Sequence, residues 1–368
     1  MEIAFVAGDL GAANAMVPVM RELAARGRSV VGVADSAGVA ETAFQASGLP
    51  LCVATGWHDA VPLREAQLLV VGTSASATGL ERVCAVQAGV RVAMFSDSYF
   101  NHANPVWRAI SARWWLAIDE AHAANIYDVH PGVEEVIVCG QPVFDDVLAL
   151  MPRKQALRRE RRGIMALGDT PLAVWWSTGI GSLAAEDLAM AEGILEHASR
   201  PLALACMMHP KLAKTVGTSY IQNTRAGLAS AARAVGIRWV EAESVPGIEL
   251  CLSADVLVSV TCTEDIKSTL IGGPPVVHLL GPDVRRWMEA DLLLAPPHYL
   301  PDIATGLSIG AHSPGEVAAS VGRALVPAER EVRAAGWRPP TGGATERTAD
   351  VLERLTSWRQ GSPHEPCR

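Results

Sequence analysis

The first candidate for chemistry is a small hydroxyl-bearing loop in the second half of the chain. Ser177, Thr178 and Gly179 follow the apolar run 172–176 and precede a segment with helical periodicity. The first backbone N–H groups of a helix lack partners and the helix dipole is positive there, so an anion is stabilised at that end. We therefore predict that this loop contacts a phosphate. The alternative is a tight turn capped by a hydroxyl.

A second loop repeats the pattern. Thr261 and Thr263 flank Cys262 after the run 256–260, and a helix is expected to begin near Glu264. The two hydroxyls again predict phosphate contact at a helix start. The alternative is that Thr263 is an ordinary N-cap followed by an exposed first turn.

His209 follows a third apolar run and precedes a proline. An imidazole can donate a hydrogen bond to a phosphate or to a leaving oxygen near neutral pH. His209 is therefore a candidate to contact a phosphate or a leaving oxygen, against the alternative of a structural histidine.

Two carboxylates are the candidates for a general base in the first half. Asp9 follows the first apolar run and Asp97 follows the fourth, and either could take a proton from a hydroxyl. Asp9 could instead cap a helix, and Asp97 could belong to an ordinary turn. Glu120 is a further candidate, and the small polar run 73–78 is a candidate loop for a sugar or an acceptor.

These loops need a scaffold that gathers them at one edge. Short apolar runs alternate with helical segments, which is typical of doubly wound α/β domains with parallel sheets. Ligands of such sheets bind at the carboxyl ends of the strands. We predict two Rossmann-like domains at 1–150 and 171–340 with a cleft between them, a linker at 151–170, and a closing helix with a tail at 341–368. The expected strands are 2–7, 29–34, 67–72, 90–95, 114–118, 135–138, 172–176, 202–208, 237–240, 256–260 and 275–280.

Composition excludes several classes of protein. Hydrophobic residues make up 49% of the 368 residues and charged residues 19%, enough for two buried cores. The net charge of −8 excludes a nucleic-acid partner, and the basic stretch 153–162 is interpreted as a solvated helix. The chain starts directly in a strand and contains no long apolar span, which predicts a cytoplasmic protein without a membrane span.

Cofactor motifs are absent from the sequence. The seven cysteines are scattered without a C-x-x-C pair, and no histidine or carboxylate spacing indicates a metal site. The loop 8–11 is not G-x-G-x-x-G, which argues against a dehydrogenase, and there is no P-loop. We expect no cofactor and no metal.

Five motifs in sequence order resemble those of the GT-B glycosyltransferase superfamily. They are Ala7–Gly11 with the following helix, Cys139–Asp145, Met208–Pro210, Ala254–Ser259 with the stretch up to Val277, and Gly342–Arg347. The nearest similarity is to UDP-N-acetylglucosamine 2-epimerases, lipid A disaccharide synthase and CDP-glycerol-type transferases. The resemblance implies two Rossmann-like domains, with 1–150 as the acceptor domain and 171–340 as the nucleotide-sugar domain. It also implies that His209, in the His-Pro match, contacts the nucleotide.

The sequence also departs from these relatives. Lys267 stands where an acidic residue usually contacts the nucleotide ribose, and Glu264 or Asp265 would replace it if the register slips. Residues 96–100 replace the epimerase motif after the fourth strand, and the loop 177–181 is closer to that of transferases. These differences argue against ordinary 2-epimerisation.

The resemblance therefore implies a metal-independent glycosyltransferase. Its partners would be a nucleotide-sugar donor, taken as UDP-linked, and a small-molecule acceptor, with a homodimer as the candidate assembly. Two alternatives stay open: an epimerase or hydrolase that acts on the sugar nucleotide itself, and a non-catalytic relative that binds a nucleotide sugar.

Overall fold

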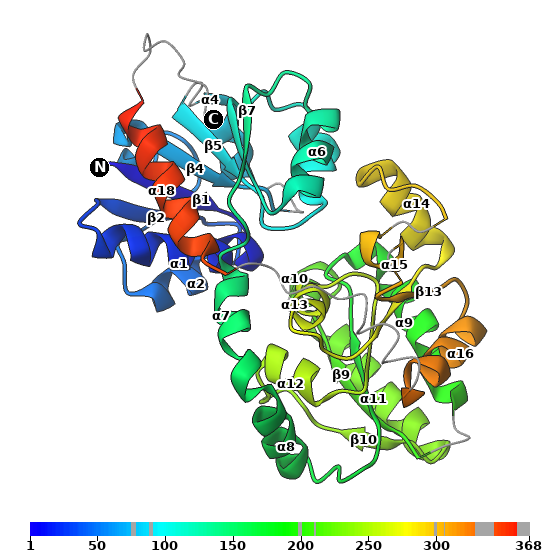
Figure 1. Ribbon diagram of the computed structural model, residues 1–368. Coiled ribbons are helices and arrows are strands. Elements are labelled where there is room, and N and C mark those ends of the chain that lie inside the picture. Colours follow the sequence, from blue (N-terminus) through cyan, green and yellow to red (C-terminus); the bar gives the residue numbers. More distant parts are fainter. Residues whose placement is uncertain are drawn as a thin grey trace. The chain divides into compact units, whose positions relative to one another are not determined.

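The chain forms two compact units. The computed structural model describes residues 1–368 except 75–78, 88–90, 198–200, 210, 298–299, 305, 328–341 and 359–368. Unit 1 comprises Met1–Asp146 and Thr341–Arg368, and unit 2 comprises Val147–Pro340 (Figure 1). The C-terminal helix thus belongs to unit 1, and the stretch 151–170, expected to be a linker, lies within unit 2. The chain has the predicted α/β architecture of two parallel sheets.

Unit 1 contains a parallel sheet of seven strands within the described residues, in the order β3-β2-β1-β4-β5-β6-β7. Its strands are β1 (Ile3–Ala7), β2 (Val30–Asp35), β3 (Leu51–Ala54), β4 (Leu68–Gly72), β5 (Val92–Phe95), β6 (Trp114–Ala117) and β7 (Glu135–Val138). Its helices are α1 (Leu10–Ala25), α2 (Glu41–Ser47), α3 (Val61–Glu65), α4 (Gly79–Gln87), α5 (Pro105–Arg108), α6 (Glu120–Val129), α7 (Val143–Ala149), which ends in unit 2, and α18 (Ala344–Ser357).

The strand β1 shows why this sheet is buried on both faces. Ile3 and Phe5 lie in one hydrophobic cluster with α1 and α18, whereas Ala4 and Val6 lie in a second cluster on the opposite face. Successive side chains of a strand point to opposite faces, so a continuous apolar run fits only a sheet covered on both sides.

The helix α18 packs beside α1 in unit 1 (Figure 1). The Asp145 carboxylate accepts hydrogen bonds from the backbone N–H groups of Ala344 and Thr345, at 3.1 and 2.7 Å, and so caps the start of α18. Gly140 has a φ of +88°, and a Cβ there would lie 2.7 Å from the Ala344 Cβ. Two of the motifs quoted for the resemblance, 139–145 and 342–347, therefore hold this helix in place.

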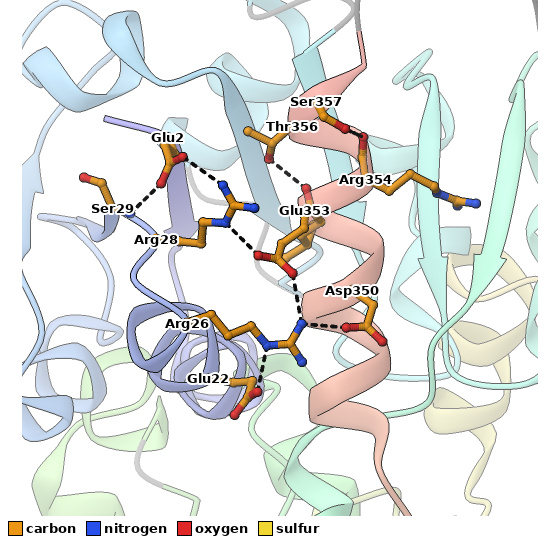
Figure 2. Close-up of polar contacts among 11 residues, drawn as sticks. Glu2, Glu22, Arg26, Arg28, Ser29, Asp350, Glu353, Arg354, Thr356 and Ser357 are labelled. Carbon is orange, nitrogen blue, oxygen red and sulfur yellow. Dashed lines mark hydrogen bonds and ion pairs between the residues drawn. The ribbon is translucent and has the colours of Figure 1, made fainter.

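Ion pairs surround the contact between α1 and α18 (Figure 2). Arg26 pairs with Glu22 on its own helix and with Asp350 and Glu353 on α18. Arg28 also pairs with Glu353, at 2.6 Å. These ion pairs lie at the edge of the interface between α1 and α18, whose centre is apolar.

Unit 2 contains a parallel sheet of six strands within its described residues, in the order β10-β9-β8-β11-β12-β13. Its strands are β8 (Leu172–Trp176), β9 (Ala203–Met207), β10 (Arg238–Val240), β11 (Val256–Ser259), β12 (Val276–Leu279) and β13 (Ile309–Ala311). Its helices are α8 (Lys154–Ile164), α9 (Ala184–Ala191), α10 (Lys211–Thr215), α11 (Thr218–Ala234), α12 (Gly247–Ser253), α13 (Thr263–Leu270), α14 (Pro282–Asp291), α15 (Pro301–Ala304) and α16 (Pro314–Ala324).

The basic stretch 153–162 forms α8, which packs against α12 in unit 2. Arg158 donates to the carbonyl oxygens of Leu252 and Ala254, and Arg162 donates to that of Ser253. Both guanidinium groups also pair with the Asp255 carboxylate. The arginines of α8 satisfy the end of α12, where the last carbonyl groups of a helix lack partners. This packing corrects the interpretation of 153–162 as a merely solvated helix.

The edge strands β3 and β13 are absent from the list of expected strands. Each is short and pairs with a single neighbour: β3 with β2, and β13 with β12. Such a strand is defined by its pairing more than by its own sequence. The run 90–95 is shorter in the structure, where β5 begins at Val92.

Candidate functional site

In unit 2, the loop after β8 is joined to the loop after β9. The Ser177 hydroxyl oxygen accepts a hydrogen bond from the His209 backbone N–H at 2.8 Å, and Ser177 is 4% exposed. Because that bond uses the oxygen as an acceptor, the hydroxyl proton of Ser177 can be donated to another group. Pro210, which completes the predicted His-Pro motif, lies outside the described residues.

The imidazole of His209 lies against Gly179. A Cβ at Gly179 would lie 2.9 Å from both Cε1 and Nδ1 of the ring, so a larger residue at 179 would displace the histidine. The backbone N–H of Lys211 donates to His209 Nδ1 at 3.1 Å. With Nδ1 acting as the acceptor, the neutral ring carries its proton at Nε2. The structure therefore makes Nε2 the hydrogen-bond donor of this side chain.

Thr178 has a different environment from Ser177. Its hydroxyl oxygen accepts from the Ile180 N–H at 3.2 Å, and its own N–H donates to the Asp187 carboxylate at 2.6 Å. Asp187 also accepts from the Trp175 indole at 3.1 Å, and burial raises the pKa of its carboxyl to about 7. Thr178 and Asp187 thus shape the turn that presents Ser177 and Gly179. Sequence reasoning missed Asp187, which occupies a helix position that looks solvent-facing.

Helix α13 begins at Thr263, with Cys262 as its N-cap and without a side-chain cap hydrogen bond. Thr263 is therefore the first helical residue and not the N-cap that the alternative predicted. Thr261 is half-buried and Thr263 is exposed. The neighbouring helix α14 differs, because Glu186 accepts from the backbone N–H groups of Asp283 and Val284 at its start.

Glu264 and Lys267, the two candidates for the ribose-contacting position, pair with each other. Lys267 Nζ donates to Glu264 Oε1 at 2.7 Å, one turn along α13. The second oxygen, Oε2, is buried and has no hydrogen-bond partner among the described residues. A Cβ at Gly247 would lie 3.1 Å from the Glu264 carboxyl carbon, so the glycine leaves room for this side chain.

A buried polar network lies next to the start of α13. His278 on β12 contacts the Val260 carbonyl oxygen through Nδ1 at 3.1 Å and Asp302 Oδ2 through Nε2 at 2.7 Å. The Ser259 hydroxyl donates to the Asp265 carboxylate on the first turn of α13. Burial raises the pKa of Asp265 to about 6. Burial alone would lower the pKa of His278, but the Asp302 carboxylate raises it to about 9.

In unit 1, the carboxylates of Asp9 and Asp97 both lie close to Gly11. A Cβ at Gly11 would lie 3.1 Å from Asp97 Oδ2 and 3.5 Å from Asp9 Oδ1. Asp9 is the N-cap of α1, and its Oδ1 accepts from the Ala12 N–H at 3.0 Å. This is the capping role that the sequence left as the alternative for Asp9.

Asp97 is oriented by its neighbours. Its Oδ1 accepts from the Asn101 side-chain amide at 2.9 Å and from the Thr73 hydroxyl at 3.3 Å. Its backbone carbonyl accepts from the Gln141 side chain at 2.9 Å. Asp97 itself is half-buried. The candidate base thus has a fixed carboxylate. The nearby Tyr99 hydroxyl donates to Asp119.

A third carboxyl group, Glu81 on α4, lies beside these two. Its Oε1 accepts from the Gly8 N–H at 2.9 Å, and its Oε2 is hydrogen-bonded to the Ser74 hydroxyl. The side chain is fully buried, and burial together with the nearby Asp9 raises the pKa of Glu81 to about 8. Glu81 is therefore a protonated acid at neutral pH beside two aspartates.

The remaining predicted residues are separate from this cluster or only partly described. Glu120 is an exposed residue in the first turn of α6. Thr73 and Ser74 of the polar run 73–78 are fully buried and bond to Asp97 and Glu81, respectively, while 75–78 lie outside the described residues.

The described part of the chain contains neither a metal-binding cluster nor a membrane-spanning helix. No group of three or more histidine, cysteine, aspartate or glutamate side chains there has an arrangement that could hold a metal ion. No helix in that same part is long and apolar enough to cross a membrane.

The fold of these units is of the GT-B type, as in the solved structures that the chain resembles. Among solved structures, the chain is similar to UDP-GlcNAc 2-epimerase from Neisseria meningitidis bound to UDP-GlcNAc, with a TM-score of 0.68, 14% identity and coverage of 96% of this chain and 100% of that one. It is also similar to MurG from Acinetobacter baumannii, with a TM-score of 0.55, 15% identity and coverage of 96% and 99%. The wall teichoic acid polymerase TagF matches with a TM-score of 0.55, 11% identity and coverage of 96% and 88%.

No family model matches the sequence. No curated protein matches it either. The similarity to solved structures extends over nearly the whole chain, and it is a similarity of fold.

Proposed function

We propose that this protein is a glycosyltransferase that uses a nucleotide-diphosphate sugar, with UDP as the first nucleotide to test. Unit 2 binds the nucleotide through Ser177, Gly179 and His209 after β8 and β9, and through Thr261, Thr263 and Glu264 at the start of α13. The solved structures similar to this chain include proteins bound to UDP-GlcNAc and UDP.

The observation that carries this proposal is the way Ser177 and His209 are joined. The His209 backbone N–H donates to the Ser177 hydroxyl oxygen and holds it in place, while the Lys211 N–H fixes the His209 tautomer with its proton at Nε2. Two oriented donors at neighbouring strand ends of a parallel sheet are suited to phosphate oxygens. The start of α13, which has no side-chain cap, would add the positive end of a helix dipole.

In this proposal, the protein's own groups stabilise the departing diphosphate. The helix end and the hydroxyls are fixed before reaction, so they need no rearrangement as negative charge develops. Thr178 orders the loop through its bonds to Ile180 and Asp187. Asp97, with Asp9 as the alternative, is the proposed general base for an acceptor hydroxyl.

Substitution of His209 tests nucleotide binding. His209→Asn leaves an oxygen near the position of Nδ1 for the Lys211 N–H but removes the Nε2 donor. Because a charge-assisted hydrogen bond is worth about 1.5–3 kcal/mol, UDP should bind about ten- to a hundredfold more weakly. Isothermal titration measures the affinity. His209→Gln, whose amide reaches toward the Nε2 position, should recover part of it.

The controls separate binding from folding and identify the reaction. Circular dichroism should show an unchanged fold, and unchanged UDP affinity in His209→Asn would exclude the assigned role. Incubating the protein with UDP-GlcNAc in the absence of an acceptor distinguishes the enzymatic alternatives by NMR. Turnover without an acceptor would favour the epimerase or hydrolase, and failure to bind ADP, CDP, GDP or UDP would exclude a nucleotide-sugar enzyme.

A further inference from the structure

The histidine buried beneath the start of α13 has no role in the assignments above. His278 on β12 is 3% exposed and pairs in register with Ser259 at the end of β11. Its two ring nitrogens face two acceptors on different segments, the Val260 carbonyl oxygen and the Asp302 carboxylate. An imidazole can donate to two acceptors only when both nitrogens carry protons, so this side chain is an imidazolium.

The location of one acceptor links His278 to the proposed site. Val260 immediately precedes Thr261. Residues 261 and 262 lead into α13, and together with its first residue, Thr263, they are called the turn 261–263. The bond from His278 to the Val260 carbonyl therefore ties the turn to the neighbouring strand. Asp302 on α15 holds the opposite edge of the ring and prevents it from rotating away.

Two carboxylates lie close to His278 near this turn. Asp265 and Asp302 are both carboxylates close to His278, and the field of His278 favours the ionised form of each. Asp265 Oδ1 is buried and has no hydrogen-bond partner among the described residues.

We propose that His278 is a positioning residue for phosphate binding: it holds the Val260 carbonyl and, through it, the turn 261–263 in the geometry that receives the diphosphate. This inference rests on the proposed function, because it assigns the turn to the phosphates of the nucleotide. His278 is not a catalytic residue, since it is buried and acts through the backbone.

Two substitutions at position 278 separate positioning from general stability. In His278→Asn, the amide lies near the position of Nδ1 and can still donate to the Val260 carbonyl. In His278→Gln, the amide reaches the position of Nε2, faces Asp302 and leaves the Val260 carbonyl without its donor. Both substitutions remove the imidazolium. If His278 contributed only a structural ion pair, the two variants would therefore have the same ligand affinity.

The affinities of UDP and of inorganic pyrophosphate are measured by isothermal titration on the full chain. We expect His278→Gln to weaken both about tenfold, which corresponds to about 1.4 kcal/mol, and His278→Asn to stay within about threefold of the wild type. Equal affinities in two folded variants would overturn the inference. If His278→Asn does not fold, Asp302→Asn takes its place in the comparison with His278→Gln. Asp302→Asn keeps the bond from His278 to Val260, so its affinities should also stay within about threefold of those of the wild type.

The outcomes distinguish this inference from the proposed function. If the wild type binds UDP and the variants do not differ, only the positioning role of His278 is wrong. If the wild type binds neither pyrophosphate nor any of ADP, CDP, GDP and UDP, the proposed function is wrong and the inference is overturned with it.

Discussion

The three carboxyl groups of unit 1 differ in their surroundings, and this difference separates their roles. Asp9 caps α1, Glu81 is enclosed between Gly8 and Ser74, and Asp97 is half-buried with its oxygen bonded to Asn101. Because the pKa of Glu81 is raised to about 8 by burial, Glu81 cannot serve as a base at neutral pH. This leaves Asp97 as the better candidate for the general base, with Asp9 as the alternative.

At the residue scale, we predict that Asp97→Asn reduces turnover of a nucleotide sugar about 10²–10⁴-fold, as removal of a general base typically does. UDP affinity should stay within about threefold, because the nucleotide is assigned to unit 2. Steady-state kinetics and isothermal titration measure the two effects. Asp9→Asn is the matched control, since asparagine also caps helices well. If Asp9→Asn loses activity and Asp97→Asn keeps it, the base is Asp9.

At the scale of elements, α18 shows how a distant segment completes a domain. Leu352 and Ala349 are fully buried in the cluster that includes α1, while the ion pairs of Arg26 and Arg28 lie at the exposed edge (Figure 2). Surface ion pairs contribute about 0–1 kcal/mol, whereas a buried leucine contributes several times more. The apolar contact therefore determines the docking of α18.

We predict that Leu352→Ala lowers the free energy of unfolding of unit 1 by about 2–5 kcal/mol, because it removes buried methyl groups and leaves a cavity. Asp350→Ala, at a residue whose side chain is 67% exposed, should change it by less than about 1 kcal/mol. Urea denaturation followed by tryptophan fluorescence measures both. An equal loss in the two variants would show that the ion pairs contribute as much as the core.

At the scale of the whole molecule, buried titratable groups in both units make stability depend on pH. The pKa is raised to about 8 for Glu81, to about 7 for Asp187 and to about 9 for His278. Above pH 6.5 the folded chain keeps protons on these groups that the unfolded chain has released. Their contribution to stability is therefore lost as pH rises through the folded pKa values.

The buried histidines His102 and His122 act in the opposite direction. Their ring nitrogens lie 3.1 Å apart, and burial lowers the pKa of His102 to about 3 and that of His122 to about 4. Below pH 6.5 the unfolded chain takes up protons that these rings do not, so their contribution falls with falling pH. Between pH 4.5 and 6.5, acidification lowers stability through His102 and His122 and raises it through Glu81 and Asp187, so the two effects offset each other.

We predict that the free energy of unfolding falls between pH 6.5 and pH 8, by about 1.4 kcal/mol per pH unit for each proton held only by the folded chain. Glu81→Gln should flatten this dependence, because glutamine resembles the protonated acid and keeps an acceptor for the Gly8 N–H. Urea denaturation at both pH values measures the slope. The exposed Glu65→Gln should leave the slope unchanged, and a wild-type stability that rises from pH 6.5 to pH 8 would contradict the prediction.

The sequence by itself determined the class of fold and the location of the main loops. Apolar runs such as 3–7 and 172–176 fit only strands buried on both faces, and alternation with helices makes the sheets parallel. The loops that contain Ser177, His209 and Asp97 follow from the same pattern, since each comes directly after a run. These are local features, so a single sequence contains them.

Tertiary structure decided which polar side chains are buried and what they contact. Glu81, Asp187 and His278 occupy positions in helices or strands that local pattern does not distinguish from exposed ones. Their partners, such as Gly8 at 73 positions from Glu81, are brought close only when the strands pair. Burial then removes water from the carboxyl or the imidazole and shifts its pKa, a consequence of packing that no spacing in the sequence records.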